Sequence, residues 1–595
     1  MPNPGLAFPV RQKMGWAALA VLLAFAGPSA AAAEARDQAF MQDLASLEAA
    51  LKAELGRGLS ELSLPGMPRP YFISAVVTDT DAIRVAATLG GLQTSQHHNQ
   101  RALQVEVRVG GYEFDDSNFM GDGWVQRARL LPLEMDPLSV QRAAWLLIDG
   151  AYKDATARFE AKRSIRHGQA ASEERPQSFA RVEPQRFTEV EPAAPGPEAD
   201  WVALARRLSA AFRPFNDLLD SGVVVASAAS RRLLVTTEGS QIADSGAQVT
   251  IVAWATTQAP DGMMLRHHAV FVADDRSALP SETDMEAAVR TVAQELGELS
   301  RAPVVDNYSG PVLFEGIAAG QLLEALVAQQ VSGTPPPESS MGEIPANNPW
   351  SSRVNLRVLP KGFSVTDDPT LERWGTAPLM GHYAYDDEGV PAQHVELVSN
   401  GILRQLLMSR TPSKESGASN GHGRFGYSTA AVGWPSNLVV RAAPGLGRAA
   451  LRARLRQVVR DDGLPYGLVV RCLDEPMVFM MVSGLQGVGA SFPHASRLSA
   501  AVIVRVYPDG KEQLVRGASL DSMETGDLRN ILAAGARASV YHSVPTALRL
   551  MSSRAGNAAG LSIVAPDLLV DRVEVNKVAG PYAKGPLLGR PAVSP

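Results

Sequence analysis

The chain has 595 residues, of which 45% are hydrophobic and 20% are charged, as is typical of soluble globular proteins. This length exceeds what one hydrophobic core supports, so we expect two or more domains. The net charge of −6 lacks the basic excess of nucleic-acid-binding proteins, so we predict no nucleic-acid partner. Cys472 is the only cysteine, which excludes an intramolecular disulfide.

The N-terminus has the pattern of an export signal. Arg11 and Lys13 precede an uncharged apolar run, Met14–Ala26, and a Gly-Pro break and small residues follow it. We therefore expect residues 1–33 to be a cleaved signal peptide and the protein to be exported to the periplasm or the extracellular space. An uncleaved anchor is the alternative, but the run is short for a membrane span, and no later segment reaches that length.

The next 270 residues alternate between helical and β-type patterns. We predict an α+β domain at 34–169, a Pro- and Glu-rich linker or surface excursion at 170–200, and a second α+β segment at 201–302. The order helix, strands, helix occurs twice, so the two segments form either a weak duplication or one large sheet with helices on one face. Apolar periodicity predicts helices at 36–62, 138–163, 201–212 and 282–299, and strands at 71–77, 82–89, 102–109, 223–226, 232–236, 249–255 and 267–272.

From residue 303 onward short β-type runs dominate, separated by Gly, Pro, Asn and Asp. Asn400-Gly401 between two such runs predicts a hairpin, because both residues tolerate positive φ. The arginines of 448–460 fit the solvated face of a helix better than a phosphate-binding track. The runs lie at 352–359, 383–385, 393–399, 402–409, 438–441, 478–482, 500–507 and 513–517. We therefore predict an α+β chain, with an N-terminal helix-and-sheet region before a strand-rich C-terminal domain at 303–595.

The segment 303–326 is the most informative part of the chain. A β-type run ends at Phe314 and leads directly into a helix, with Glu315 at the junction. A zinc peptidase would carry two histidines about one helical turn apart here, with a glutamate between them as general base. The segment contains no histidine. It therefore predicts a peptidase-like scaffold without its usual metal ligands.

Residues 303–595 resemble the TldD/PmbA family of peptidases. The most specific block is 381–393, with Tyr385-Asp-Asp-Glu-Gly389 at its centre. Two N-terminal blocks, Arg69–Ser74 and Tyr112–Phe119, resemble exported members more loosely. The other matching blocks are 311–320, 397–403, 507–511, 514–518 and 564–569.

The resemblance also implies which residues of this chain occupy the zinc-ligand positions of the family. Zinc-bearing TldD members bind zinc through a His-Glu-x-x-x-His segment and a cysteine near the C-terminus. The resemblance aligns the two histidine positions with Phe314 and Ala319, and only Glu315 matches. The cysteine position falls within 553–561, which contains no cysteine. We therefore expect no cofactor and no metal site. In this respect the chain is similar to the PmbA (TldE) branch, which is thought to pair with a zinc-bearing TldD subunit.

Glu315 is the candidate catalytic residue, with a helix N-terminal carboxylate as the structural alternative. Tyr383, Asp386, Asp387 and Glu388 are candidates for a peptide groove, although the three acidic residues beside a glycine also fit a turn.

Other residues offer weaker alternatives. His382, His394 and His422 could assemble a metal site from distant parts of the chain, but single histidines are weak metal signals. The glycine-rich segments 420–426 and 484–489 fit flexible loops beside a groove better than phosphate-binding loops.

Three functions remain open at this stage. The first is a non-catalytic subunit of a periplasmic peptidase complex, partnered by a histidine-bearing TldD-like subunit or by self-association and handling a peptide substrate. The second is an active peptidase with a rearranged or metal-free site. The third is a non-enzymatic peptide-binding protein. In all three the mature protein is expected to have no membrane span.

Overall fold

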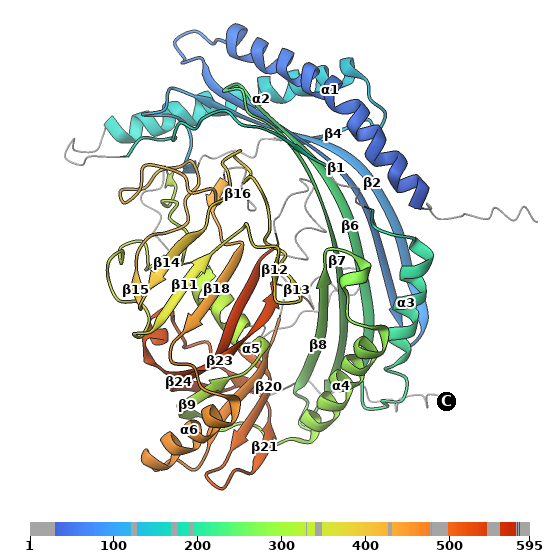
Figure 1. Cartoon of the computed structure of the whole chain (residues 1–595), viewed down its shortest axis with the longest axis vertical. Helices are drawn as coiled ribbons and strands as arrows, with labels where there is room; N and C mark the ends of the chain where they lie inside the picture. Colours follow the sequence, from blue (N-terminus) through green and yellow to red (C-terminus); the bar gives the residue numbers. More distant parts are fainter. Residues whose placement is uncertain are drawn as a thin grey trace, which may run out of the picture.

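The chain forms a long curved sheet with helices on its outer face and a second, larger sheet system against its inner side (Figure 1). The computed structural model describes residues 30–120, 128–167, 176–190, 194–328, 330–339, 348–425, 431–475, 478, 498–543, 560–578, 580 and 582, with side chains of the first helix from residue 38 onward. The predicted signal peptide lies outside these residues up to position 29. The predicted α+β class is confirmed.

Seven strands form the N-terminal sheet, in the order β4-β2-β1-β6-β7-β5 with β8 on β7. Both predicted α+β segments contribute to it, so their strands share one sheet. The segments 71–77 and 82–89, which were predicted as two strands, form one long strand. The segments 223–226 and 232–236 likewise form one. The strands are β1 (Pro70–Thr88), β2 (Gly91–Val109), β4 (Ala128–Leu131), β5 (Arg186–Glu189), β6 (Asp220–Thr236), β7 (Gln241–Gln258) and β8 (Met264–Ala273).

All four predicted helices of this half are present, and they cover one face of the sheet. On β1 the odd-numbered residues Ile73, Ala75 and Val77 pack under α1 and α2, and Ile83 and Val85 pack under α3 and α4. Since side chains alternate across a strand, the even-numbered residues face the C-terminal half. The helices are α1 (Ala30–Glu61), α2 (Pro137–His167), α3 (Glu198–Ala210) and α4 (Glu282–Arg301).

A polar belt separates the two apolar clusters on the helix-covered face. Arg101 on β2 donates to Asp79 on β1 at 3.0 Å and to Asp43 on α1 at 3.2 Å. Arg231 on β6 lies 3.9 Å from the same Asp79, and His97 contacts Asp81. These strand residues break the apolar pattern, which explains why the sequence predicts two short strands where one continuous strand runs.

The described part of 170–200 is no free linker, although most of its residues are at least partly exposed, as in the predicted alternative of a surface excursion. Phe179 is 1% exposed, and Arg186–Glu189 form β5, which pairs in parallel with β7. Arg410 holds the same segment by donating from Nε and Nη2 to the carbonyl oxygen of Ala180, at 2.9 and 2.8 Å. This segment therefore lies between the two halves, where its apolar residue Phe179 is buried.

The C-terminal half contains an 11-stranded sheet, in the order β15-β14-β11-β18-β24-β22-β20-β19-β9 with β21 on β20 and β23 on β24. Its long strand β24 pairs with both β9 and β18 and so lies at the centre of the core. The strands are β9 (Tyr308–Phe314), β11 (Phe363–Asp367), β14 (Val395–Ser399), β15 (Ile402–Leu403), β18 (Asn437–Ala442), β19 (Gly467–Leu473), β20 (Ser499–Val506), β21 (Glu512–Val515), β22 (Ala518–Ser519), β23 (Ile531–His542) and β24 (Ser562–Lys577).

The shorter elements complete this half. Helix α5 (Ile317–Leu323) continues as a π-helical turn, η2 (Glu324–Ala328), and α6 (Arg448–Asp461) packs on the far side of the sheet. Three small pairs are β3 (Phe119–Met120) with β10 (Glu338–Ser339), β12 (Arg373–Trp374) with β13 (Ala377–Pro378), and β16 (Gly423–Phe425) with β17 (Ala431–Gly433). The 3-10 turns are η1 (Arg276–Ala278) and η3 (Thr525–Asn530).

The predicted hairpin at Asn400-Gly401 is confirmed, since β14 pairs with β15 and the two residues have φ of 48° and 78°. No strand forms at 352–359, where Asn355 has a positive φ of 67°, or at 383–385, which enters a turn. The run 402–409 is a strand only to residue 403, and of 478–482 only residue 478 is described.

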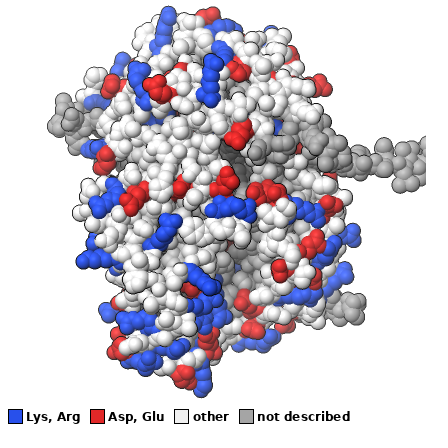
Figure 2. Space-filling view, in the orientation of Figure 1, with Lys and Arg blue, Asp and Glu red and all other residues white. Residues whose placement is uncertain are grey.

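The solvent-facing prediction for the arginines of α6 holds for most of them, as Leu451, Leu455 and Val459 form the buried side of the helix. Lys and Arg gather around the lower end of the molecule, interspersed with acidic residues (Figure 2). Cys472 is buried on β19, and burial raises the pKa of its thiol. No helix in the described ranges has both the length and the apolarity to cross a membrane.

Candidate functional site

The junction between β9 and α5 is built as the sequence predicts. Strand β9 ends at Phe314, and the N–H of Glu315 continues the sheet pattern by donating to Val470 on β19 at 3.0 Å. Gly316 then turns the chain with φ of 60°, a conformation that favours glycine. Its N–H donates to the Asp567 carboxylate at 2.7 Å, and the helix begins at Ile317. The backbone around Glu315 is thus fixed on both sides.

The Glu315 carboxylate is held in an ion pair. Arg452 on α6 donates from Nε to one oxygen at 2.7 Å and from Nη2 to the other at 2.8 Å. The same guanidinium contacts Glu512, which also binds Arg471 at 2.7 Å. Hydrogen bonding to Glu315 raises the pKa of Arg452 above its usual value. Both Glu315 oxygens therefore accept from a permanent cation, which makes this carboxylate a poor base for activating water.

The two flanking positions are apolar and buried. Phe314 and Ala319 are each 0% exposed and belong to the main C-terminal core, beside Ala318 and Leu322. Neither side chain can donate electrons to a metal. Among the described residues no three His, Cys, Asp or Glu side chains converge in a way that could hold a metal ion. Most of 553–561, where the resemblance sets the cysteine position, lies outside the described residues.

The three histidines of the alternative metal site lie around one short segment, residues 367–369, yet face different groups. His422 Nε2 is 3.0 Å from Asp367, His394 Nδ1 is 3.1 Å from Asp368, and His382 Nδ1 is 3.0 Å from the carbonyl oxygen of Pro369. Each ring is oriented by its own acceptor, so the set does not form a common ligand shell.

The acidic residues predicted for a groove are buried. Asp386, Asp387 and Glu388 are 0%, 2% and 8% exposed, so the expectation that they line an open peptide groove is not met in this structure. Asp386 accepts hydrogen bonds from the backbone of Glu388 at 3.0 Å and of Val390 at 2.8 Å, which confirms the turn. Tyr383 is partly buried, and its hydroxyl donates to the Gly421 carbonyl at 2.9 Å.

These acids instead join the two halves of the molecule. Asp387 lies 3.1 Å from Arg232 on the inner face of β6. Asp386 and Asp387 also accept from the backbone of Gly423 and Phe425, both at 2.8 Å. The predicted flexible loop at 420–426 is therefore wrong for 423–425, which form β16 because these carboxylates bind their N–H groups. The second glycine-rich segment, 484–489, lies outside the described residues.

Burial changes the proton affinity of this interface. It raises the pKa of Glu388 to about 8, with the nearby Asp386 as the next cause, and the pKa of Asp386 to about 6. Glu388 also accepts from the backbone N–H of Arg410 at 2.6 Å. Glu388 thus holds its proton more tightly than an exposed glutamate does and acts as part of the packing.

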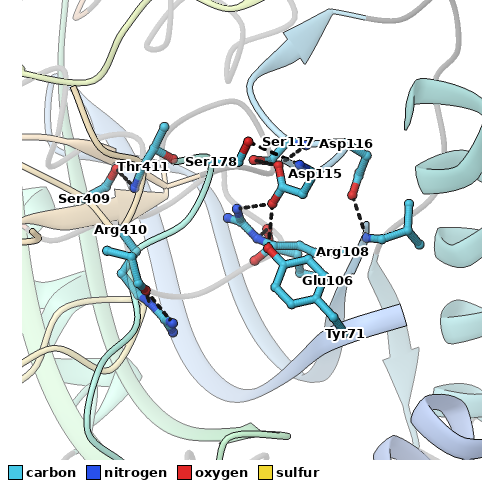
Figure 3. A network of polar contacts seen from close by, with 12 residues as sticks. Tyr71, Glu106, Arg108, Asp115, Asp116, Ser117, Ser178, Ser409, Arg410 and Thr411 are labelled. Carbon is cyan, nitrogen blue, oxygen red and sulfur yellow. Dashed lines mark hydrogen bonds and ion pairs between the residues drawn. The ribbon is translucent and has the colours of Figure 1, made fainter. Parts of the chain in front are cut away.

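The two N-terminal blocks of the resemblance meet in one network (Figure 3). The Tyr71 hydroxyl donates to Asp115 at 2.7 Å, and Arg108 lies 3.3 Å from the same carboxylate. The ring of Phe179 lies between two guanidinium groups, with Arg108 at 3.7 Å and Arg410 at 3.8 Å from its centroid. This network ties β1 and β2 to the C-terminal half.

A second buried polar cluster lies beside α5 and was not predicted. The Tyr541 hydroxyl lies 2.8 Å from both Glu324 and Glu475, and Gln321 donates to Glu475 at 3.0 Å. Burial, followed by the charge of Glu324, raises the pKa of Glu475 to about 8. The only sequence signal was the acidic pair Asp474-Glu475 directly after an apolar strand.

Comparison with known proteins places this geometry in a family. Residues 307–577 match the PmbA/TldA metallopeptidase C-terminal domain. A metalloprotease of Archaeoglobus fulgidus is 36% identical over 72 residues, which are 12% of this chain and 16% of that protein. The chain thus aligns with less than a fifth of the length of that relative.

Two solved structures share the fold. TldE from Thermococcus kodakarensis aligns with a TM-score of 0.50 and 12% identity, over 85% of this chain and 97% of that one. A Thermotoga maritima protein, described as a candidate modulator of a DNA gyrase, aligns with a TM-score of 0.52 and 14% identity, over 85% and 96% of the two chains. Residues 307–577 therefore form a C-terminal domain of the TldD/PmbA family of metallopeptidase-related proteins, and the chain around it shares the fold of these solved structures.

Proposed function

We propose that this protein is a non-catalytic, TldE-like subunit of an exported peptidase assembly. In this role it associates with a histidine-bearing TldD-like relative, or with a second copy of itself, and contributes to the handling of peptides. The single observation that carries the proposal is the two-point ion pair between Glu315 and Arg452.

The residues at the junction do not suit zinc. Structural and catalytic zinc sites use imidazole nitrogen, thiolate or carboxylate ligands that converge within about 2.0–2.3 Å of the ion. Phe314 and Ala319 offer none, and both are packed in the apolar core. Of the carboxylates at the junction, Glu315 already accepts from Arg452 with both oxygens, and Asp567 accepts from the Gly316 N–H.

The same argument weighs against Glu315 as a metal-free base. A general base needs a lone pair directed at the water that it deprotonates. Here Glu315 is 6% exposed, and both of its carboxylate oxygens accept hydrogen bonds from Arg452. Its position between strand and helix instead fixes α6 against the β9–α5 junction.

Metal analysis and a peptidase assay test the proposal together. The purified mature protein should retain no stoichiometric zinc after dialysis and should cleave no unstructured peptide alone. Addition of a histidine-bearing TldD-like relative should give a stable complex by size-exclusion chromatography and chelator-sensitive cleavage. Glu315→Gln in this chain should leave that cleavage intact, with the exposed Glu372→Gln as matched control.

Two outcomes would contradict the proposal. One tightly held zinc per chain, with cleavage that is lost in Glu315→Gln, would identify an enzyme in its own right. Cleavage by the protein alone that resists chelators and is abolished by Glu475→Gln would identify a metal-free peptidase that uses the buried cluster beside α5.

A further inference from the structure

A cavity of about 530 Å³ opens on the C-terminal half, away from the β9–α5 junction. Small-ligand pockets typically have volumes of about 300–1,000 Å³, so it has room for a ligand of one or two rings. Its walls come from four segments: the extended chain 332–336, the turn 348–352, the loop 413–415, and Trp434 directly after β17.

The walls are held in place by hydrogen bonds that do not depend on a ligand. Asn348 donates to the carbonyl oxygen of Ser332 at 2.6 Å and accepts from the backbone of Trp350 at 3.0 Å. The Thr334 hydroxyl accepts from the Gly433 N–H at 2.8 Å. The Ser413 hydroxyl accepts two backbone N–H groups of its own loop, each at 3.2 Å. The cavity is therefore preorganised, which lowers the entropy cost of binding.

Trp434 is fixed in the same way. Its backbone N–H donates to the carbonyl oxygen of His422 at 3.0 Å, and the His422 ring is anchored on the buried Asp367. The Trp434 side chain is only partly buried, and in the described part of the chain its ring stacks on no other ring and no cation. Trp434 therefore lines the cavity with a ring that has no stacking partner among the described residues.

Several polar groups of the lining are also unused. Within the described ranges, the hydroxyls of Ser332 and Ser352, the carboxylate of Glu415 and the indole N–H of Trp434 make no side-chain hydrogen bond. In the cluster beside α5, by contrast, Glu475 and Tyr541 are already bonded to each other. Polar groups in a cavity wall that have no partner within the chain are free to bind a ligand, unlike those of a packed interior.

We propose that this cavity binds a neutral saccharide of one or two rings. Serine hydroxyls both donate and accept, as sugar hydroxyls do, and the Trp434 ring offers an apolar surface to the C–H face of a pyranose. Lys414 and Glu415 stand side by side at the rim with opposite charges, which favours neither an anion nor a cation. The proposal is independent of the proposed function.

A peptide fits the cavity less well. Strand-like binding of a peptide needs a row of backbone N–H and C=O groups. The wall contains Pro335 and Pro336, which have no N–H to donate. The observations therefore favour a ligand recognised through hydroxyl groups.

Saturation-transfer NMR against a panel of neutral saccharides tests the inference on the full mature protein. The panel consists of glucose, galactose, mannose and N-acetylglucosamine with their α- and β-linked disaccharides, at millimolar concentration, and the tripeptide Ala-Pro-Ala serves as competitor. At least one saccharide should bind and alter tryptophan fluorescence. Trp434→Ala should weaken that binding about tenfold, or about 1.4 kcal/mol, because it removes the aromatic surface on which the sugar ring packs.

Controls separate binding from folding. Trp145→Ala on α2, where the ring is 53% exposed, should leave saccharide binding unchanged. Ser352→Ala and Glu415→Gln, both at exposed positions, should weaken binding without changing the melting temperature. The inference is overturned if no saccharide of the panel binds, if binding survives Trp434→Ala, or if the tripeptide binds more tightly than every saccharide.

Discussion

Replacing Arg452 by methionine should loosen the β9–α5 junction by about 3 kcal/mol. The Glu315 side chain is 7% exposed and that of Arg452 is 24% exposed, so the pair is largely shielded from water. Removing one partner of a buried pair costs about 3–5 kcal/mol, and we take the lower end because Arg452 is partly solvated. The lost contact to Glu512 adds little, because Arg471 still binds that residue.

A double-mutant cycle isolates the pair. Glu315→Gln alone should cost about 1.5 kcal/mol, because the stranded Arg452 is partly exposed, and the double variant should cost about 2.5 kcal/mol, which gives a coupling energy of about 2 kcal/mol. Arg460→Met is the matched control on the same helix. Among the described residues its guanidinium makes only a 3.5 Å contact with the Pro508 carbonyl oxygen, so the change should stay within about 0.5 kcal/mol.

Hydrogen exchange of the amides from residue 315 to 319 is the suitable assay, because it reports local opening even where a large protein does not unfold in one step. A loss of 3 kcal/mol corresponds to exchange about 100-fold faster under conditions where the rate follows the opening equilibrium. A coupling energy below about 0.5 kcal/mol would refute the view that the ion pair fixes Glu315, and would reopen its role as a base.

Two further predictions concern protonation and packing. Glu475 has a pKa of about 8 in the folded chain against 4.5 ordinarily, so between pH 4.5 and 8 the unfolded chain releases a proton that the folded chain keeps. Its contribution to stability is thus greatest below pH 4.5, falls as the pH rises, and levels off above pH 8. Glu475→Gln should flatten this fall in melting temperature relative to the exposed control Glu372→Gln, and an unchanged slope would contradict the argument. Gly433→Ala should lower the melting temperature by several degrees, since its Cβ would lie 1.9 Å from the carbonyl oxygen of Leu407. Gly447→Ala, which has open space, should not, and equal effects of the two would count against the close packing of β17.

Local features were predictable because their causes are local. Apolar periodicity located all four N-terminal helices, and the turn at Asp386 follows from an Asp side chain bonding its own backbone. The strand–helix junction at Glu315 was likewise apparent from the sequence. The full length of the long strands was not apparent from the sequence. In β1, for example, Asp79 and Asp81 interrupt the apolar pattern on which strand prediction depends.

The partners of the site residues were not predictable. Glu315 and Arg452 are 137 positions apart, and Arg232 and Asp387 are 155 apart. A charged residue on a helix or strand has the same sequence pattern whether it faces water or a distant carboxylate. The expectation that the acidic block lines a groove was not met for this reason. Only the fold shows that Arg232 on β6 binds Asp387.

The length of the N-terminal strands has a consequence for how this half can form. Strand β1 has 19 residues, which at about 3.3 Å per residue is about 60 Å, and it pairs along most of that length with both β2 and β6. A slip of one residue anywhere along it would turn every side chain to the opposite face at both ends. The apolar cluster under α1 and α2 and the one under α3 and α4 therefore depend on the same strand register. Neither pair of helices can set this register alone. A fragment that ends before β6 would lack the strand that fixes this alignment, and we expect it to populate shifted pairings instead of folding as a smaller copy of the whole.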